Sequence, residues 1–134
     1  MEHPELSIVV AVNNRRILEN NLLRSPALAD PTYRHQMVVK EGFATAGAAY
    51  NSGPDEARND LVMFIHQDMY LPADWMSRLF EAIRTLDAAG ENWGVLGCAG
   101  VTSEPRTGVG QVYSTGLGVI GQRLDQPVAV DTLD

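Results

Sequence analysis

Cysteine is almost absent from this chain of 134 residues, which contains one, Cys98. A single thiol forms no internal disulfide, and the apolar residues at 95–99 indicate a small buried side chain. We therefore expect a reducing, cytoplasmic location. The sequence also lacks a positive segment before its first apolar stretch, and no apolar run approaches the roughly 20 residues of a membrane span. These absences predict a soluble, unprocessed protein with no membrane span.

Basic side chains are also scarce, since 10 Lys and Arg residues stand against 17 Asp and Glu residues and give a formal net charge of -7. Such a charge opposes broad attraction to phosphate backbones and anionic lipid surfaces. We therefore exclude nucleic acid as a partner. A small anionic ligand stays compatible, because a metal ion or a few arginines, such as Arg15, Arg16 and Arg106, offset its charge locally.

Several well-known motifs are missing. The sequence has no Cys/His cluster with zinc spacing, no Gly-x-Ser-x-Gly elbow and no Walker motif. The glycine pairs at 108–110 and 116–118 do not join a buried strand to a helix, as phosphate loops do, so we interpret them as turns. Nucleophilic hydrolase chemistry therefore has little support.

Short apolar runs alternate with amphipathic stretches along most of the chain. The runs at 6–12, 61–65 and 93–98 have the composition of strands buried on both faces of a parallel sheet, and 36–39 is a weaker strand. The 45% hydrophobic content is sufficient for one core, so we expect a single domain over 1–134. The alternation predicts an α/β fold, Rossmann-like, with a mostly parallel sheet flanked by helices and right-handed crossovers.

Polar and proline residues mark the helix ends. Asn13 and Asn14 are suited to capping a first helix, which we expect to stop at Ser25-Pro26 before a loop over 27–34. The alanine-rich residues 42–51 predict a second helix, and Pro54 opens a further helical turn.

The longest predicted helix starts near Pro72 and ends at Gly90. Its expected apolar stripe consists of Trp75, Leu79, Ile83 and Leu86. Beyond Gly100 the residues are mainly Gly, Thr and Ser, with alternating apolar positions at 110–116. This pattern predicts a C-terminal β-hairpin or meander.

Polar residues follow two of the apolar runs directly, Asn13 after the first and 66–68 (His-Gln-Asp) after the second. Ligands of open α/β sheets bind at the carboxyl ends of strands, so both positions are candidate site residues. Asp68 and His66 offer oxygen and imidazole donors suited to Mg²⁺ or Mn²⁺ bridging a diphosphate. The structural alternatives are that Asp68 caps a turn, that His66 is a hydrogen-bonded structural histidine and that Asn13 is an N-cap.

Residues 49–53 (Ala-Tyr-Asn-Ser-Gly), Ala57 and the run 61–69, with its His-Gln-Asp element, resemble family 2-like glycosyltransferases. The resemblance is strongest to the subgroup named after a streptomycin-biosynthesis protein. Residues 6–13 look like the opening strand of that family, and 93–100 look like the strand after its long helix. The resemblance extends to 128–134, which are similar to the segment leading into the family's second half, and so covers nearly the whole chain.

The resemblance implies a GT-A fold and a nucleotide-sugar donor held through Mn²⁺ or Mg²⁺. Asp68 aligns with the metal-binding aspartate of an Asp-x-Asp-type motif, and His66 replaces the first aspartate, so the implied metal ligands are Asp68 and His66. By the same resemblance Asn13 lies beside the base and Asn51 near the donor, while Glu41 loosely matches an acidic residue after the second strand. The implied donor-binding set is Asn13, Glu41, Asn51, His66, Gln67 and Asp68.

Asn51, Lys40 and Glu41 either contact a ligand or have no binding role. In the second case Asn51 only forms a turn and the two charged side chains are only solvated, because asparagine is common in turns and charges at strand ends are usually solvated. The family's catalytic acidic residue belongs to a segment after Asp134, so no catalytic residue is named and activity is an open question. The first hypothesis is a metal-dependent glycosyltransferase or its donor-binding part. The alternatives are a truncated, non-catalytic binding or assembly module, expected to form a homodimer, and an unrelated doubly wound domain.

Overall fold

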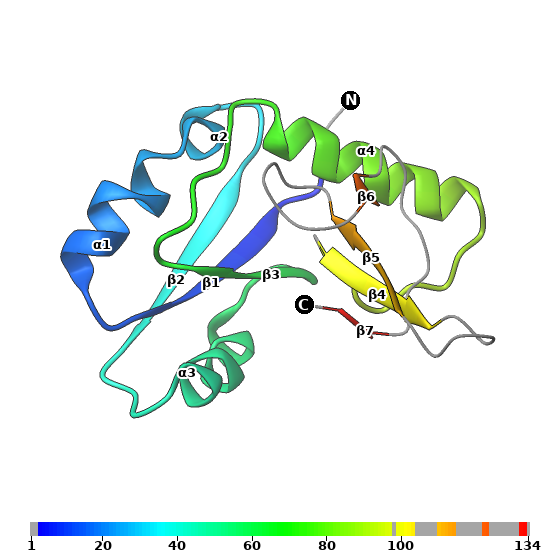
Figure 1. Ribbon diagram of the computed structural model, residues 1–134. Helices are drawn as coiled ribbons and strands as arrows, with labels where there is room; N and C mark the ends of the chain where they lie inside the picture. The colour runs from blue at the N-terminus through cyan, green and yellow to red at the C-terminus, as the bar shows by residue number, and fades with distance from the viewer. Residues whose placement is uncertain (1–2, 98, 104–109, 115–121, 124–131, 134) are drawn as a thin grey trace. The chain divides into compact units, whose positions relative to one another are not determined.

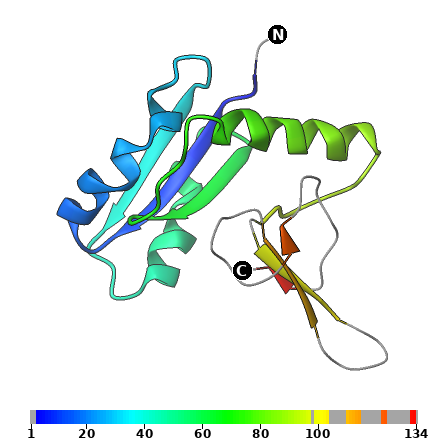
Figure 2. The same cartoon turned by 45° about the horizontal axis from the view of Figure 1, so that its top comes forward.

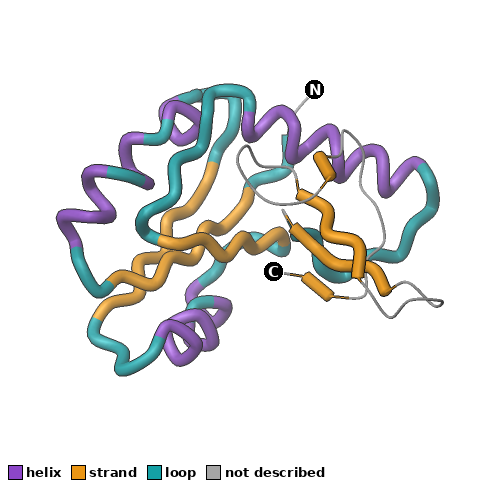
Figure 3. The backbone as a smooth tube through the Cα atoms, in the orientation of Figure 1, coloured by secondary structure: helices purple, strands orange, loops and turns teal. Residues whose placement is uncertain are grey.

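The computed structural model describes residues 3–97, 99–103, 110–114, 122–123 and 132–133 (Figures 1 and 3). The chain forms two compact units, Met1–Arg78 and Leu79–Asp134. Among the helices of the described ranges, none has both the length and the apolar character that a membrane crossing requires.

The first unit is built on a three-stranded parallel sheet of order β2-β1-β3. Its strands are β1 (Leu6–Val12), β2 (His35–Glu41) and β3 (Leu61–His66). The central strand is rich in β-branched residues, and Ile8, Val9 and Val10 are fully buried. The expected α/β class with a parallel sheet is thereby confirmed. The weaker strand predicted at 36–39 is present as β2, which is longer than predicted.

Three short helical segments connect β1 to β2: α1 (Arg15–Asn20), the 3₁₀ helix η1 (Leu22–Arg24) and α2 (Pro26–Ala29). Asn14, not Asn13, caps α1, because its side chain accepts from the backbone N–H groups of Arg16 and Ile17. η1 ends at Arg24, next to the predicted stop at Ser25-Pro26, but the first helix already ends at Asn20, and the loop predicted from residue 27 begins only at Asp30 because residues 26–29 form α2. Pro26 opens α2, since proline lacks only an N–H that the first helical turn leaves unpaired.

The connection from β2 to β3 contains α3 (Ala46–Ser52) and the 3₁₀ helix η2 (Pro54–Glu56), both close to the predicted positions. Figures 1 and 2 show α3 on one face of the sheet and α1 with α2 on the other. The connection from β1 to β2 and the connection from β2 past β1 to β3 run in opposite directions across the sheet, so crossovers of one hand require helices on opposite faces. The carboxyl end of β1 is therefore a topological switch point, the usual position of a ligand site.

Helix α4 (Trp75–Ala88) begins in the first unit and ends in the second. Pro72 precedes it by one turn, where its carbonyl accepts from Trp75 N, and Gly90 follows it with a φ of 71°. The expected stripe of Trp75, Leu79, Ile83 and Leu86 is only half-buried. Met76 and Phe80 are the buried residues of α4, so its most buried line is displaced by one residue from the predicted stripe.

The second unit contains a four-stranded sheet of order β6-β5-β4-β7, formed by β4 (Ala99–Ser103), β5 (Gly110–Ser114), β6 (Gln122–Arg123) and β7 (Thr132–Leu133). β4 pairs with β5 and β7 antiparallel, in line with the predicted C-terminal β-hairpin or meander. Cys98 and Arg106 lie outside the described residues.

The strand predicted over 93–98 was wrong, because residues 93–97 belong to no strand and β4 starts at Ala99. The indole of Trp93 donates to Asp87 Oδ1 at 3.2 Å, which ties this segment back to α4. Val95 is 75% exposed. Gly94 and Gly97 weaken strand formation within the run, since glycine loses more conformational freedom on folding than other residues.

Gly53 gives a direct test of how α3 packs on β1. A Cβ added at Gly53 would overlap the Val9 side chain, although the backbone of Gly53 is ordinary αR. We expect Gly53→Ala to lower the free energy of unfolding by about 1–3 kcal/mol, as overpacking does. Urea denaturation measures the change.

The matched control is Gly47→Ala in the same helix, where an added Cβ meets nothing within 4 Å. It should leave stability unchanged or raise it by up to about 1 kcal/mol, the helix propensity difference. Equal losses in the two variants would contradict a close approach that is specific to Gly53.

Candidate functional site at the carboxyl edge of the parallel sheet

A pocket of about 290 Å³ lies at the carboxyl ends of the three parallel strands, within the first unit. We call it the carboxyl-edge pocket. Two groups of residues line it: Ala11, Val12, Asn13, His66, Gln67 and Asp68 from the β1 and β3 ends, and Lys40, Phe43, Ala44, Thr45, Ala46, Ala49 and Tyr50 from the β2 end and α3. The structure therefore brings four of the six predicted donor-binding residues together at the switch point.

Gln67 joins the ends of β1 and β3 with its side chain. Its Oε1 accepts from the backbone N–H groups of Asn13 and Asn14, both at 3.2 Å, and its Nε2 donates to Asn13 Oδ1. The amide of Gln67 thus fixes both the backbone turn after β1 and the orientation of the Asn13 side chain. Asn13 is held as a pocket residue, while the capping role falls to Asn14.

Tyr50 reaches from α3 to the end of β3. Its hydroxyl donates to Ile65 O at 2.8 Å and lies 3.4 Å from His66 Nδ1. Because the single hydroxyl proton goes to Ile65 O, the phenol oxygen is left as an acceptor for the imidazole. A hydrogen bond to Tyr50 therefore requires the proton of neutral His66 on Nδ1, and this tautomer keeps a lone pair on Nε2 for a ligand.

Asp68 is exposed at the pocket and makes no hydrogen bond or ion pair within the described part of the chain. Its charge is nevertheless felt by Tyr50. Burial raises the pKa of the Tyr50 phenol above its ordinary value of 10.0, and the negative charge of Asp68 adds to this effect. A backbone hydrogen bond from Ala11 acts in the opposite direction and lowers the pKa.

Lys40 and Phe43 form the pocket wall near the end of β2. Lys40 Nζ lies 2.6 Å from Glu56 Oε1 and 5.5 Å from the centroid of the Phe43 ring, and the lysine side chain is only 12% exposed. The ammonium group is thus held by a carboxylate and by an aromatic face. Phe43 is 42% exposed, so its ring stays accessible from the pocket.

Two predicted site residues lie outside the lining. Glu41 receives both Arg15 Nε (3.1 Å) and Arg15 Nη2 (2.8 Å) in a bidentate ion pair on the exposed surface. This pair raises the pKa of Arg15, first through the hydrogen bond and then through the charge of Glu41. Asn51 lies exposed on α3 and is not part of the pocket wall.

The donor set at the turn is small. Within the described ranges, no three His, Cys, Asp or Glu side chains are grouped so that they hold a metal ion. Asp68 and His66 are the carboxylate and the imidazole that line the carboxyl-edge pocket. Mg²⁺ is typically bound through one or two carboxylates and completes its shell with water and phosphate oxygens, so Asp68 is the residue of this set that suits such an ion. The set does not fit a metal enclosed by protein ligands alone.

Three residues line the pocket that were not predicted from the sequence: Tyr50, Phe43 and Thr45. Thr45 caps α3 by accepting from Ala48 N at 3.1 Å, a role indicated by its position three residues before Ala48 at the start of an alanine-rich helix. Tyr50 is the one large side chain among the residues of α3, and that contrast was a usable signal. Nothing in the local pattern distinguishes Phe43.

Replacement of Gln67 by alanine removes three hydrogen bonds between the ends of β1 and β3. Because these groups are partly exposed, we expect Gln67→Ala to lower the free energy of unfolding by about 1–2 kcal/mol. Chemical denaturation checks this value. Asp68→Ala is the neighbouring control and should change stability by less than about 0.5 kcal/mol. A neutral Gln67→Ala would show that the turn holds its shape without this side chain.

Tyr50 predicts a specific pH dependence of stability. Since its folded pKa is raised, its contribution is fully present below the ordinary value of 10.0 and is lost as pH rises through the folded pKa. In Tyr50→Phe, the fall in unfolding free energy on the alkaline side should therefore be shallower than in the wild type. Urea denaturation from about pH 8 to pH 11 measures both profiles.

Tyr70→Phe, at a side chain that is 58% exposed, is the matched control, and its profile should follow the wild type. Parallel profiles for wild type and Tyr50→Phe would contradict the prediction.

Comparison of the chain with known proteins found no match among family models, curated proteins or solved structures.

Proposed function

We propose that the protein is glycosyltransferase-like and binds a nucleoside-diphosphate sugar in the carboxyl-edge pocket, with Mn²⁺ or Mg²⁺ at the turn formed by His66, Gln67 and Asp68. The observation that carries the proposal is the convergence of Asn13 and this turn on one pocket at the switch point of a parallel sheet. The resemblance of residues 49–69 to family 2-like glycosyltransferases supports the same assignment. The GT-A fold is part of the proposal.

The volume of the pocket limits how such a ligand would lie. About 290 Å³ is at the small end of the usual range for ligand pockets. A nucleoside diphosphate would therefore be enclosed only in part, with the diphosphate next to Asp68 and the remainder along the Lys40 and Phe43 wall. The exposed Phe43 ring offers a flat apolar surface, and Asn13 offers amide groups already oriented by Gln67.

Metal binding in the proposal rests on Asp68 and His66. The Asp68 carboxylate is the anionic donor. His66 contributes Nε2 when its Nδ1–H group donates a hydrogen bond to the Tyr50 hydroxyl oxygen. A bound divalent ion would neutralise the charge that develops on the nucleoside diphosphate as the sugar leaves. The protein side of the scheme is to hold the donor and to keep the imidazole in a coordinating tautomer.

A second candidate is a binding module that takes the nucleotide without transferring the sugar. It is favoured by one feature of the pocket: Asp68 is the single carboxylate among the described residues that line it. A group that binds metal is poorly suited to act at the same time as the base for an acceptor hydroxyl. In this alternative the pocket is a recognition or assembly site.

The proposal is tested by calorimetric titration of UDP and GDP into the full chain, with and without Mn²⁺. We expect binding of at least one nucleotide that depends on the metal, and a loss of about tenfold or more in Asp68→Ala. Asp55→Ala is the matched control, because Asp55 is an exposed aspartate outside the pocket. It should bind like the wild type.

The outcomes separate the candidates. No binding of either nucleotide by the wild type, or equal binding by Asp68→Ala, would overturn the proposed site. Metal-dependent nucleotide binding, together with transfer of the sugar from the corresponding nucleotide sugar to an acceptor, favours the transferase. Binding without any turnover favours the recognition module.

A further inference from the structure

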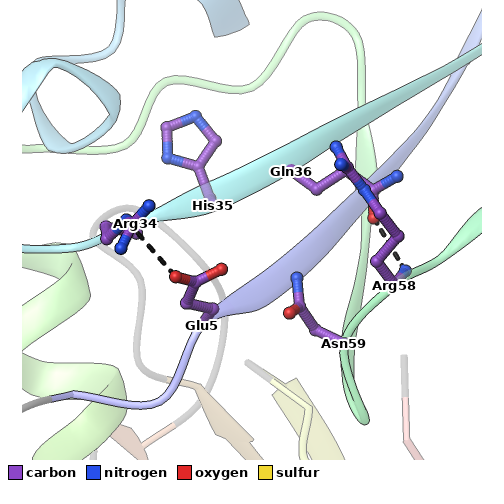
Figure 4. Close-up of a pocket in the computed structure, with 6 residues that line it drawn as sticks. All are labelled: Glu5, Arg34, His35, Gln36, Arg58 and Asn59. Carbon is purple, nitrogen blue, oxygen red and sulfur yellow. Dashed lines mark hydrogen bonds and ion pairs between the residues drawn. The ribbon is translucent and has the colours of Figure 1, made fainter.

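A second pocket, of about 250 Å³, lies at the opposite end of the same three strands. We call it the amino-edge pocket. It is lined by Glu5, Arg34, His35, Gln36, Arg58 and Asn59, which directly precede or begin β1, β2 and β3 (Figure 4). The two pockets share no lining residue, so neither the proposed nucleotide site nor its resemblance accounts for this one.

A hydrogen-bond network around Ser7 fixes one wall of the amino-edge pocket. The fully buried Ser7 hydroxyl donates to Gln36 Oε1 at 2.7 Å and accepts from Asn59 N and Nδ2 at 3.2 and 3.1 Å. Gln36 Oε1 also accepts from Arg58 N at 2.8 Å, and Gln36 Nε2 donates to Glu56 O at 2.9 Å. The backbone that carries Arg58 and Asn59 is therefore held in place before any ligand arrives, which reduces the entropy lost on binding.

Charge in the amino-edge pocket is positive on balance. Arg34 Nε and Glu5 Oε1 form an ion pair of 3.3 Å, so these two charges offset each other. In the part of the chain that the structure describes, no carboxylate lies within ion-pair distance of Arg58. The pocket thus holds one uncompensated guanidinium in a chain whose formal net charge is -7. Guanidinium groups bind carboxylates and phosphates through two parallel hydrogen bonds.

Arg34 is a second cation that a ligand can recruit. The side chains of its ion pair with Glu5 are 76% and 46% exposed, and such exposed pairs contribute little to stability. In the view of Figure 4, Arg34 and Arg58 stand on either side of the pocket, with Glu5 and Asn59 between them. An anion between the two arginines can therefore compete with Glu5 for Arg34.

We propose that the amino-edge pocket is a second binding site, for a small anion with a carboxylate or phosphate group held by the Arg58 guanidinium. The Asn59 side-chain amide supplies a hydrogen bond, and Arg34 supplies a second cation. The carboxylate and the phosphate share the oxyanion chemistry that Arg58 recognises. The site is independent of nucleotide binding at the carboxyl-edge pocket.

The test is titration of the full chain with inorganic phosphate and, separately, with succinate, followed by ¹H–¹⁵N NMR. We expect saturable shifts at His35, Arg58 and Asn59 with at least one of the two anions, and the anion that binds more tightly identifies the ligand class. Arg58→Ala should weaken binding by about tenfold or more, and Arg58→Glu should abolish it. Both variants keep the backbone hydrogen bond from Arg58 N to Gln36, so the network should survive.

Arg24→Ala is the matched control, since Arg24 is an exposed arginine on η1 outside the pocket, and it should bind like the wild type. The proposal is overturned if neither anion causes saturable shifts, if the shifts lie at residues 66–68 instead, or if Arg58→Ala binds as tightly as Arg24→Ala. Failure of nucleotide binding leaves this result unaffected, because the two pockets have no residue in common.

Discussion

The burial of β1 between two parallel neighbours is the constraint on which the first unit depends. A strand whose residues are buried on both faces needs cover above and below, and both connections of the chain have to supply it. Since the first connection leads from β1 to β2 and the second from β2 past β1 to β3, crossovers of one hand place α3 opposite α1 and α2. The strand order therefore reverses at β1, and the carboxyl-edge pocket lies at the carboxyl end of this strand.

The sequence predicted those parts of the fold in which composition and periodicity act over several residues. The runs that form β1 and β3 are strongly apolar, and the alanine-rich segment that forms α3 has few alternatives. The prediction failed where one side-chain hydrogen bond decides the outcome. Trp93 donates a hydrogen bond to Asp87, and its segment lies outside the sheet, whereas the apolar sequence pattern alone predicts a strand. The helical turn at Pro26 likewise depends on a tertiary contact, because Ser25 Oγ accepts from Leu71 N at 2.9 Å.

The location of the candidate site could be predicted from the sequence, but several of the residues that line it could not. Strand ends are visible in the sequence, so Asn13 and the His66 to Asp68 turn could be assigned to one edge. The role of Tyr50 required knowledge of which face α3 presents to β3, and the removal of Glu41 from the pocket depends on an ion pair with Arg15, 26 residues away. The amino-edge pocket had no signal at all, since its residues belong to three separate strand starts without a common motif.

The hydrogen bonds of Gln67 have a consequence for any anion that enters the carboxyl-edge pocket. Backbone N–H groups after the first strand of an open α/β sheet are natural donors to phosphate. Here the N–H groups of Asn13 and Asn14 are already engaged by Gln67 Oε1. A phosphate that uses these N–H groups must first displace Gln67 Oε1. The glutamine therefore keeps the turn formed when no anion is bound, and only an anion that binds the N–H groups more strongly than Gln67 does can replace it.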